Sequence, residues 1–293
     1  MSKKDVLESY LTWTLASFYV GIRTQLKCKT AKIPDTTMKR IDVLLVDNQL
    51  AKSRSQAQKL IAAKLVDVRE MGVWRRVLKS SEKFEASTAF KVAFSQEQKY
   101  VSRAGLKLEA ALNDVQLSPE GAIALDIGQS TGGFTDCLLQ QGAAQVVGIE
   151  VGRAQIASSL LSDNRVVTLE QYNARNLTLE DMPAMARQGF DIAVMDVSFI
   201  SQHLILPRIP AVLKPGGHLL SLVKPQFEVG KDFVGKHGIV RDKASFQRVE
   251  QRIHEHLTEL GFTVLAYLQS PIKGGDGNHE FLVAAQMSNN SAE

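Results

Sequence analysis

The sequence is poor in the residues that build disulfide frameworks and metal centres. Two cysteines, Cys28 and Cys137, stand in 293 residues. They cannot form a disulfide framework, which excludes the small cross-linked scaffolds and suits a reducing cytoplasm. Of the six histidines, His254 and His256 stand two positions apart on a predicted helix over 243–260, where they do not share a face. We therefore expect no metal site.

Long apolar runs are also missing. The nearest to a membrane span is 10–22, which is shorter than the ~20 residues that a bilayer requires. It follows two lysines, as a signal peptide does, but no A-x-A cleavage pattern comes after it. We therefore expect no membrane partner and a cytoplasmic protein. Met38 opens a well-patterned stretch, as a start codon would, so residues 1–37 are read as an extension of uncertain status.

Excess charge is small overall but uneven along the chain. The formal net charge is +4. Residues 38–95 hold twelve Lys/Arg against six Asp/Glu, and residues 1–37 hold six against three, so residues 96–293 are mildly acidic. A small basic module joined to a larger acidic one suggests a nucleic-acid-binding domain attached to a catalytic domain. The charge distribution alone is equally consistent with an ordinary basic surface that is exposed to solvent.

The basic module, 38–95, is predicted to be a compact α+β unit. A short helix is indicated over 41–50, and Ser53 with Gln56 forms a capping-box pattern that opens a second helix. Short strands are predicted over 65–69, 73–78 and 90–94, with a turn built around Gly72. Basic side chains that lie mostly off the apolar helix face are candidate RNA contacts: Arg54, Lys59 and Lys64.

Residues 96–286 alternate strand and helix, which predicts a doubly wound α/β sheet. The predicted strands cover 122–127, 145–150, 166–169, 192–196, 218–223, 263–268 and 280–284. A turn at 214–217 is expected before the fifth strand. Residues 287–293 form a polar tail.

A strand, a small-residue turn and a helix start follow one another over 125–136. Glycines let a ligand approach the backbone, and a helix N-terminus offers unpaired N–H groups. Polar side chains also end successive strands at Asp126, Glu150, Asn173 and Asp196, and side chains at strand ends converge on one crevice. Any one of them is equally a helix N-cap. The candidate cofactor residues are Asp126, Gly128, Ser130, Thr131, Gly132, Gly133, Phe134, Glu150, Asn173 and Asp196.

This pattern is similar to that of the Rossmann-like methyltransferases that use S-adenosylmethionine (SAM). In that class the small-residue loop lies under the methionine part and the second-strand acid holds the ribose. A nicotinamide dehydrogenase is the competing interpretation, but it favours G-x-G-x-x-G and a hydride-transfer partner, and the sequence has neither.

Four further residues, Lys107, Asp196, Lys224 and Glu280, stand in the order of the catalytic tetrad of FtsJ-like RNA 2′-O-ribose methyltransferases. The surrounding words resemble the TlyA (haemolysin A) branch over 38–286: SRAGLKLEAAL, STGGFTD, DVSFIS, KPGG, KPQFEVGK, GIVRD, SPIKG and GN-x-EFL. Gln129 replaces a usual Ala and Glu150 a usual Asp. The module over 38–95 resembles an S4 RNA-binding domain, with Lys64 where that family usually has Gly.

The resemblance implies SAM as cofactor and ribosomal RNA or a ribosomal subunit as partner, with a cytidine as the nucleotide modified. It implies Lys224 as general base, Asp196 and Lys107 as groups that position the substrate and its alkoxide, and Glu280 as their orienter. Desolvation and a nearby cation would keep Lys224 neutral enough to act. The expected RNA contacts are Arg40, Arg54, Lys59, Lys64 and Arg103.

Two other functions stay open at this point. One is haemolysis, the activity behind the branch's older name, which no spanning or long amphipathic run supports. The other is RNA binding without catalysis, against which the complete motifs argue. The residues leave the oligomeric state and the nucleotide undetermined; the short tail and the unusual extension favour the large ribosomal subunit. Lys231, Lys236, His237 and Arg241 form either an RNA-facing lid or a solvated loop.

Overall fold

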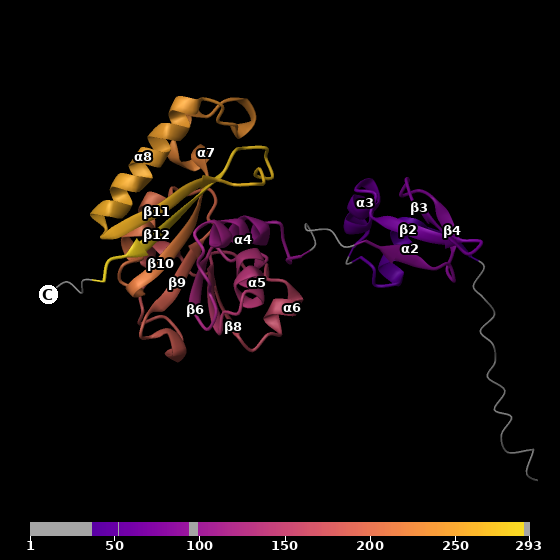
Figure 1. Cartoon of the computed structure of the whole chain (residues 1–293), viewed down its shortest axis with the longest axis horizontal. Helices are drawn as coiled ribbons and strands as arrows, with labels where there is room; N and C mark the ends of the chain where they lie inside the picture. The colour runs from indigo at the N-terminus through magenta and orange to yellow at the C-terminus, as the bar shows by residue number, and fades with distance from the viewer. Residues whose placement is uncertain (1–36, 52, 94–98, 290–293) are drawn as a thin grey trace, which may run out of the picture. The chain divides into compact units, whose positions relative to one another are not determined.

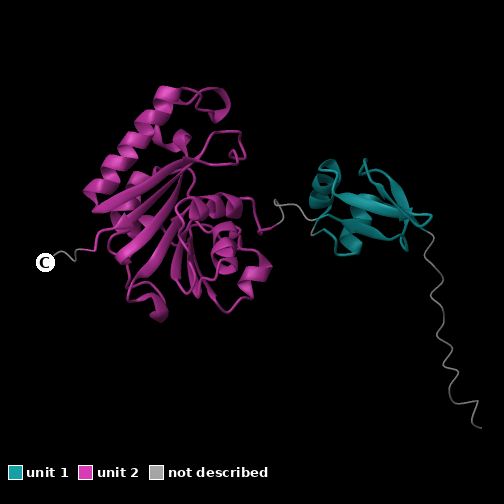
Figure 2. Ribbon diagram, viewed as in Figure 1, with its two compact units in different colours: residues 1–94 teal, residues 95–293 magenta. Residues whose placement is uncertain are grey.

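The computed structural model describes residues 37–51, 53–93 and 99–289, which fall into two compact units, Met1–Phe94 and Ser95–Glu293 (Figure 2). The predicted extension over 1–36, the domain boundary near residue 95 and the end of the polar tail lie outside the described residues. Each unit is described by itself.

Residues 37–51 and 53–93 of the first unit form two small sheets and two helices. Its elements are β1 (Met38–Arg40), α2 (Ile41–Asp47), α3 (Arg54–Ala62), β2 (Val66–Glu70), β3 (Val73–Arg76), β4 (Lys83–Glu85) and β5 (Phe90–Val92). β1 pairs with β4, and β3, β2 and β5 form an antiparallel sheet. The sequence did not indicate β1 and β4, each of which has three residues. The predicted third strand ends at Val92, and its expected end, Phe94, lies outside the described residues.

Local chemistry explains where these elements start and turn. The Ser53 hydroxyl accepts a hydrogen bond from the Gln56 N–H at 3.2 Å, which caps α3. Met71 and Gly72, with φ of 48° and 81°, join β2 to β3 in the left-handed conformations that a two-residue hairpin turn needs. Lys64, which follows α3, also adopts a left-handed conformation, at φ 57°, which residues other than glycine rarely adopt.

The second unit is a seven-stranded sheet of order β11-β12-β10-β9-β6-β7-β8 (Figure 1). The strands β6 to β10 run parallel, β12 pairs antiparallel with β10, and β11 pairs antiparallel with β12 at the edge of the sheet. Their bounds are β6 Ile123–Ile127, β7 Gln145–Glu150, β8 Val166–Glu170, β9 Phe190–Met195, β10 Leu213–Val223, β11 Phe262–Gln269 and β12 Phe281–Met287. The predicted Rossmann-like α/β class is confirmed.

Helices cover both faces of this sheet, because its central strands are apolar on both sides. One buried cluster joins the sheet to α4 (Ala104–Asp114), α5 (Gly133–Gln140) and α6 (Ser158–Leu161). The other joins it to α8 (Lys243–Glu259) and to short 3-10 turns. These turns and the remaining short helix are η2 Ala174–Asn176, η3 Ala184–Ala186, η4 Gln202–Leu204, η5 Leu206–Arg208, α7 Pro225–Glu228, η6 Lys231–Phe233 and η7 Lys236–Gly238.

One predicted feature of β10 was wrong. The turn expected at 214–217 lies inside the strand, which pairs with β9 on both sides of it: Leu213 faces Phe190 and His218 faces Ile192. The extra residues form an irregularity in the ladder, because pairing resumes after them. A glycine-containing run therefore marked a bulge and not a strand start.

The order of the strands fixes where a ligand can bind. From β6 the chain proceeds through β7 to β8 on one side, and then returns to β9 on the other side. The carboxyl end of β6 is therefore the switch point of the sheet, where open α/β sheets form their crevice.

Candidate active site

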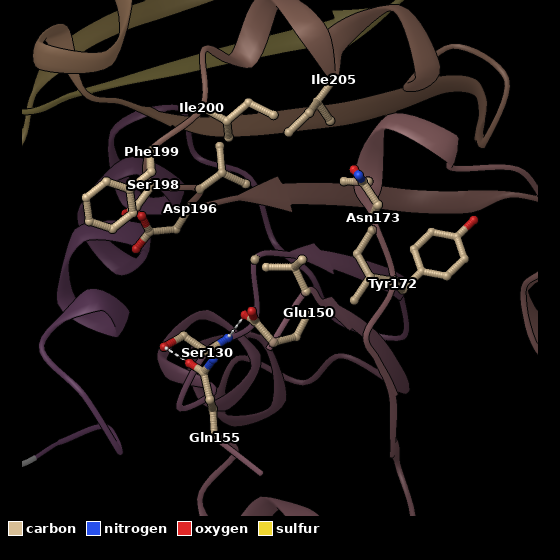
Figure 3. Close-up of a pocket in the computed structure, with 15 residues that line it drawn as sticks. Ser130, Glu150, Gln155, Tyr172, Asn173, Asp196, Ser198, Phe199, Ile200 and Ile205 are labelled. Carbon is tan, nitrogen blue, oxygen red and sulfur yellow. Dashed lines mark hydrogen bonds between the residues drawn. The ribbon is translucent and has the colours of Figure 1, made fainter. Parts of the chain in front are cut away.

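A cavity of about 530 Å³ lies at this switch point (Figure 3). Residues that follow β6, β7, β8 and β9 line it, as convergent strand ends require. The lining residues are Gly128, Ser130, Ile149, Glu150, Val151, Gln155, Tyr172, Asn173, Ala174, Asp196, Val197, Ser198, Phe199, Ile200 and Ile205. The sequence therefore found Glu150, Asn173 and Asp196 in this cavity, and missed the amide of Gln155 and most of the apolar walls.

The loop after β6 passes close to the end of β9. Gly128 has φ 81°, and a Cβ at this position would lie 2.7 Å from the main-chain oxygen of Asp196. No side chain fits there. The Ser130 N–H donates to Glu150 Oε2 at 2.8 Å, and the Gly152 N–H donates to Glu150 Oε1 at 2.8 Å. Two main-chain donors thus fix the Glu150 carboxylate at the cavity wall, with a lone pair left on each oxygen.

Asp126 is buried beneath the loop. Its Oδ2 accepts from the Thr135 N–H at 3.0 Å and from the Thr135 hydroxyl at 2.6 Å, whereas its Oδ1 has no partner among the described residues. Burial raises the pKa of Asp126 to about 7, and the charges of Asp196 and Glu150 also raise it. A buried acceptor without a donor is costly, and a ligand donor or cation would satisfy it.

Gln129 lies behind the loop. Its Nε2 donates to the Thr135 hydroxyl at 2.9 Å, and its Oε1 accepts from the Thr168 hydroxyl at 2.9 Å. The side chain crosses Gly148, whose added Cβ would lie 2.0 Å from Gln129 Cδ. Since Thr135 accepts from Gln129, its own proton is directed to Asp126. Gln129 therefore holds the loop after β6 in place through its contacts with β7 and β8.

Not every predicted loop residue faces this cavity. Asp126, Thr131, Gly133 and Phe134 line a smaller hollow of about 80 Å³, which shares Gly128, Ser130 and Asp196 with the larger one. Gly132 lines neither and forms the N-cap of α5 at φ 90°. Asn173 lines the larger cavity, and its Oδ1 also accepts from the Arg175 N–H at 3.0 Å.

The four residues of the predicted tetrad form two ion pairs. Lys107, on α4, pairs with Glu280, and both are buried. Lys224 Nζ lies 2.6 Å from Asp196 Oδ1 and donates to Ser198 Oγ at 2.7 Å. Val223 faces Phe281 across β10 and β12, so Lys224 and Glu280 adjoin the same register position. The sheet thus brings both pairs to one end, next to the cavity that Asp196 lines.

Asp196 and Lys224 each follow a strand, and further contacts join the segments that come after them. Ser201 Oγ donates to Glu228 Oε2 at 2.6 Å, and the Gln202 N–H donates to Glu228 Oε1 at 2.9 Å. The rings of Phe199 and Phe227 lie 5.3 Å apart. These contacts hold the loop after Asp196 against the helix after Lys224. The sequence analysis overlooked them, although Glu228 and Phe227 stand in the word KPQFE that follows Lys224.

Phe199 is a further residue that the sequence analysis missed. It lines the cavity, is 92% exposed and has φ 64°, which a bulky side chain rarely adopts (Figure 3). An exposed aromatic ring held in a strained conformation beside Asp196 suggests a contact surface for a substrate. The motif DVSFIS, which contains this residue, was the sequence signal that could have identified it.

Two of the predicted RNA contacts in the first unit, Arg40 and Arg54, share one acid. Asp42 is fully buried and accepts from Arg40 at 2.9 and 3.0 Å, from Arg54 at 3.1 Å and from Gln58 at 2.8 Å. The Arg40 guanidinium holds the pKa of Asp42 far below its usual range. Arg40 and Arg54 keep 41% and 58% of their side chains exposed. Lys59 and Lys64 are exposed, as is Arg103 at the start of α4 in the second unit.

The described ranges contain neither a cluster that could hold a metal ion nor a helix that could span a membrane. Among residues 37–51, 53–93 and 99–289, no group of three or more His, Cys, Asp or Glu side chains is placed to hold a metal ion. In the same ranges no helix has the length and apolar character needed to cross a membrane.

Comparison with known proteins agrees with this geometry. The FtsJ-like methyltransferase family matches residues 100–287. The chain is 39% identical over 244 residues to the 16S/23S rRNA (cytidine-2′-O)-methyltransferase TlyA of Mycobacterium tuberculosis, covering 83% of this chain and 88% of the relative. It is 39% identical over 247 residues to Hemolysin A of Brachyspira hyodysenteriae, covering 83% and 98%. A solved candidate hemolysin from Streptococcus thermophilus is 40% identical, with a TM-score of 0.65 over 87% of this chain and 90% of its own.

Fold and site together define a Rossmann-like methyltransferase. The chain belongs to the FtsJ-like methyltransferase family and, within it, to the TlyA branch, which confirms the resemblance in the sequence. The cofactor of such enzymes is SAM. The residues present fit this cofactor: the Glu150 carboxylate at the cavity wall keeps lone pairs free for hydroxyl donors, and the unpartnered Oδ1 of Asp126 suits a cationic group.

Proposed function

We propose that this protein transfers a methyl group from SAM to the 2′-hydroxyl of a cytidine in ribosomal RNA. The observation that carries the proposal is the Lys224–Asp196 ion pair at the edge of the cavity, with Lys107–Glu280 beside it. The names of relatives such as the M. tuberculosis TlyA supply the substrate and its nucleotide. A ribosomal substrate implies action in the cytoplasm.

The cofactor residues divide the cavity by chemistry. Asp126, Gly128, Ser130, Thr131 and Gly133 form the polar pocket under the loop, which suits the amino-acid part of SAM. Glu150 would accept hydrogen bonds from the ribose diol, and Asn173, which lines the same cavity as the apolar Ile149 and Ile205, would meet the adenine edge. Gly132 and Phe134 act by shaping the start of α5. When bound, SAM supplies an electrophilic methyl group.

Lys224 is assigned as the general base. A ribose hydroxyl is a poor nucleophile while protonated, so alignment and proton removal are the tasks of the protein. Lys224 performs this step in its neutral amine form: once Nζ has taken the proton of the 2′-hydroxyl, the ammonium charge is met by Asp196 at 2.6 Å, and the Ser198 hydroxyl at 2.7 Å fixes the direction of the side chain. Lys107, oriented by Glu280, is placed to hold the attacking oxygen.

The first unit, 38–95, is assigned as an S4-like RNA-binding domain, and 96–286 as the catalytic domain. Arg40 and Arg54 have defined directions because Asp42 holds both, and an ordered guanidinium loses less entropy when it binds phosphate. Lys59 and Lys64 add positive charge to the first unit, and Arg103, at the start of α4 in the second unit, is a separate candidate contact. Removing Asp42 should therefore weaken RNA binding although Asp42 itself is buried.

Transfer of tritium from labelled SAM to ribosomal subunits tests the proposal. Wild type should label RNA at a ribose, and Lys224→Ala should lose at least about 100-fold in rate, the usual contribution of a general base. SAM affinity, measured by calorimetry, should change little in this variant. Lys214→Ala is the matched control, since Lys214 pairs with Asp191 at the other end of β10. Label in a base, or full activity of Lys224→Ala, would overturn the assignment.

A further inference from the structure

The sheet formed by β3, β2 and β5 has two faces with different chemistry. Val66 and Val68 of β2 are fully buried in the cluster that contains the α2 and α3 side chains, so they define the inner face. Side chains alternate along a strand, which puts Asp67 and Arg69 on the outer face. The pairing register carries this face across the sheet, because Trp74 and Arg76 of β3 and Lys91 of β5 lie opposite these residues.

Trp74 is the centre of this outer face. Its side chain is 40% exposed, and Lys91 Nζ lies 4.6 Å and Arg69 Cζ 6.0 Å from the ring centroid. Cations at such distances hold an aromatic ring in place through its negative face. The ring therefore has a defined position on the sheet and is open to solvent.

The charge that this face presents is positive. Asp67 is its acid, but its side chain is only 14% exposed and contacts Arg76 at 2.5 Å and Lys91 at 3.7 Å. Arg76 and Lys91 are 44% and 51% exposed. The cations are therefore more exposed to solvent than the acid, so this face attracts anions.

An aromatic platform with cations around it matches single-stranded nucleic acid, whose bases stack and whose phosphates pair with Lys and Arg. A protein partner would be favoured by further apolar side chains beside Trp74. Val73 is 69% exposed, but alternation places it on the other face, opposite Glu70. Met71 and Leu78 are also exposed, but they lie beyond the ends of β2 and β3, so Trp74 is the apolar side chain that the strands themselves present on the outer face. The outer face thus combines one ring with charge, which favours RNA.

We propose that the face made by Arg69, Trp74, Arg76 and Lys91 is a second RNA-binding surface, on which Trp74 stacks an unpaired base. It lies across the core from α3, which carries Arg54 and Lys59. The RNA would be the substrate of the proposed function, so the inference rests on that function for the identity of the RNA and on the face itself for the contact.

Intrinsic fluorescence provides a direct test, because Trp13 and Trp74 are the two tryptophans of the chain. In a full-length Trp13→Phe protein, Trp74 is the fluorophore. A single-stranded RNA of about ten nucleotides should quench it, and a duplex of equal length should quench it less. Absence of quenching by any RNA that binds the protein would overturn the proposal. The proposal would also fail if the Trp74 emission shifted with protein concentration alone and sedimentation showed dimers. That result would indicate that Trp74 contacts a second copy of the protein.

Affinity for the same labelled RNA gives the second measurement. Trp74→Ala should weaken binding about 5- to 150-fold, the range for loss of one stacked base, and Trp74→Phe should stay within about 3-fold. Arg69→Gln with Lys91→Gln should reduce the salt slope by roughly 1.4, since each phosphate contact to a single strand contributes about 0.7. Arg75→Gln is the matched control, because Arg75 lies on the opposite face and binds Glu70 and Glu82.

Failure of this inference differs from failure of the proposed function. If wild type labels ribosomal RNA and Trp74→Ala matches it in affinity and KM, the face is not an RNA surface. If wild type labels no RNA but RNA quenches Trp74 and Trp74→Ala binds it more weakly, the face binds RNA and the enzymatic proposal fails. A higher KM for RNA with an unchanged kcat in Trp74→Ala supports both.

Discussion

Gln129 and Gly148 are predicted to be energetically coupled. Gln129→Ala removes two buried hydrogen bonds, to Thr135 and Thr168, and leaves these hydroxyls with fewer partners. At about 1 kcal/mol per bond, with more for groups left unsatisfied, we expect a loss of about 2–4 kcal/mol. Gly148→Ala puts its Cβ 2.0 Å from Gln129 Cδ and displaces the same side chain, so its cost should be of similar size.

The double variant should be much less unstable than the sum of the two. With Gln129 reduced to Ala, the three nearest atoms to the new Cβ are gone, because all belong to the Gln129 amide. The alanine methyl then occupies part of the space that the amide filled. We expect a coupling free energy of about 1–3 kcal/mol, the upper part of the range for residues in contact.

Urea unfolding measures this cycle. Far-UV circular dichroism follows both units, whereas both tryptophans stand in residues 1–94 and serve as an internal reference for the first unit. The fluorescence transition should stay fixed while the dichroism transition moves. Gly275→Ala is the glycine control, because a Cβ there meets nothing within 4 Å. Additivity within about 0.5 kcal/mol would refute the role that we assign to Gln129 in holding the loop.

Four further predictions follow from the site and its surroundings. The pKa of Asp126 is raised to about 7, so wild type should lose stability as pH rises from about 4 to 7; Asp126→Asn should remove this loss in thermal melts, and an unchanged pH profile would contradict the assignment. The pKa of His203 is lowered to about 4, mainly by burial and then by the charge of His256, so stability should fall as pH drops from about 6.5 to 4, and His203→Gln should weaken this dependence. Phe199→Ala should raise KM for RNA or lower kcat in labelling assays while SAM affinity stays unchanged, since the ring is exposed. Asp42→Asn should weaken RNA binding about 3- to 10-fold in anisotropy titrations, because Arg40 and Arg54 lose their common anchor, and full affinity would count against that role.

Strands of the second unit were predictable because they are short apolar runs that end in turn residues. β7 has the predicted bounds, 145–150, and β6, β8, β9 and β11 differ by one or two residues at their ends. β10 was predicted to start at His218 but starts at Leu213, since pairing with β9 continues past the bulge at 214–217. Propensity marks a Pro-Gly-Gly run as a break, and only the partner strand decides that the ladder resumes.

The candidate site was predictable where one residue carries one signal. Acids after strands led to Asp126, Glu150 and Asp196 because strand ends converge in this class of sheet. The contacts between side chains far apart in sequence were not predictable. Gln129 contacts Thr168, and Ser201 contacts Glu228, only because the fold brings their segments together. The same is true of the shared anchor Asp42, whose burial no periodicity revealed.

The order in which the chain is synthesised gives the edge of the sheet a further consequence. β11 and β12 are made after the other strands of this sheet, yet β12 pairs with the eleven-residue β10 near the middle of the sheet. Until residues 262–287 are available, β10 presents an open row of backbone donors and acceptors, which invites pairing with other chains. A chain cut short after α8 should therefore aggregate, and chaperones should bind the nascent protein most strongly during this interval.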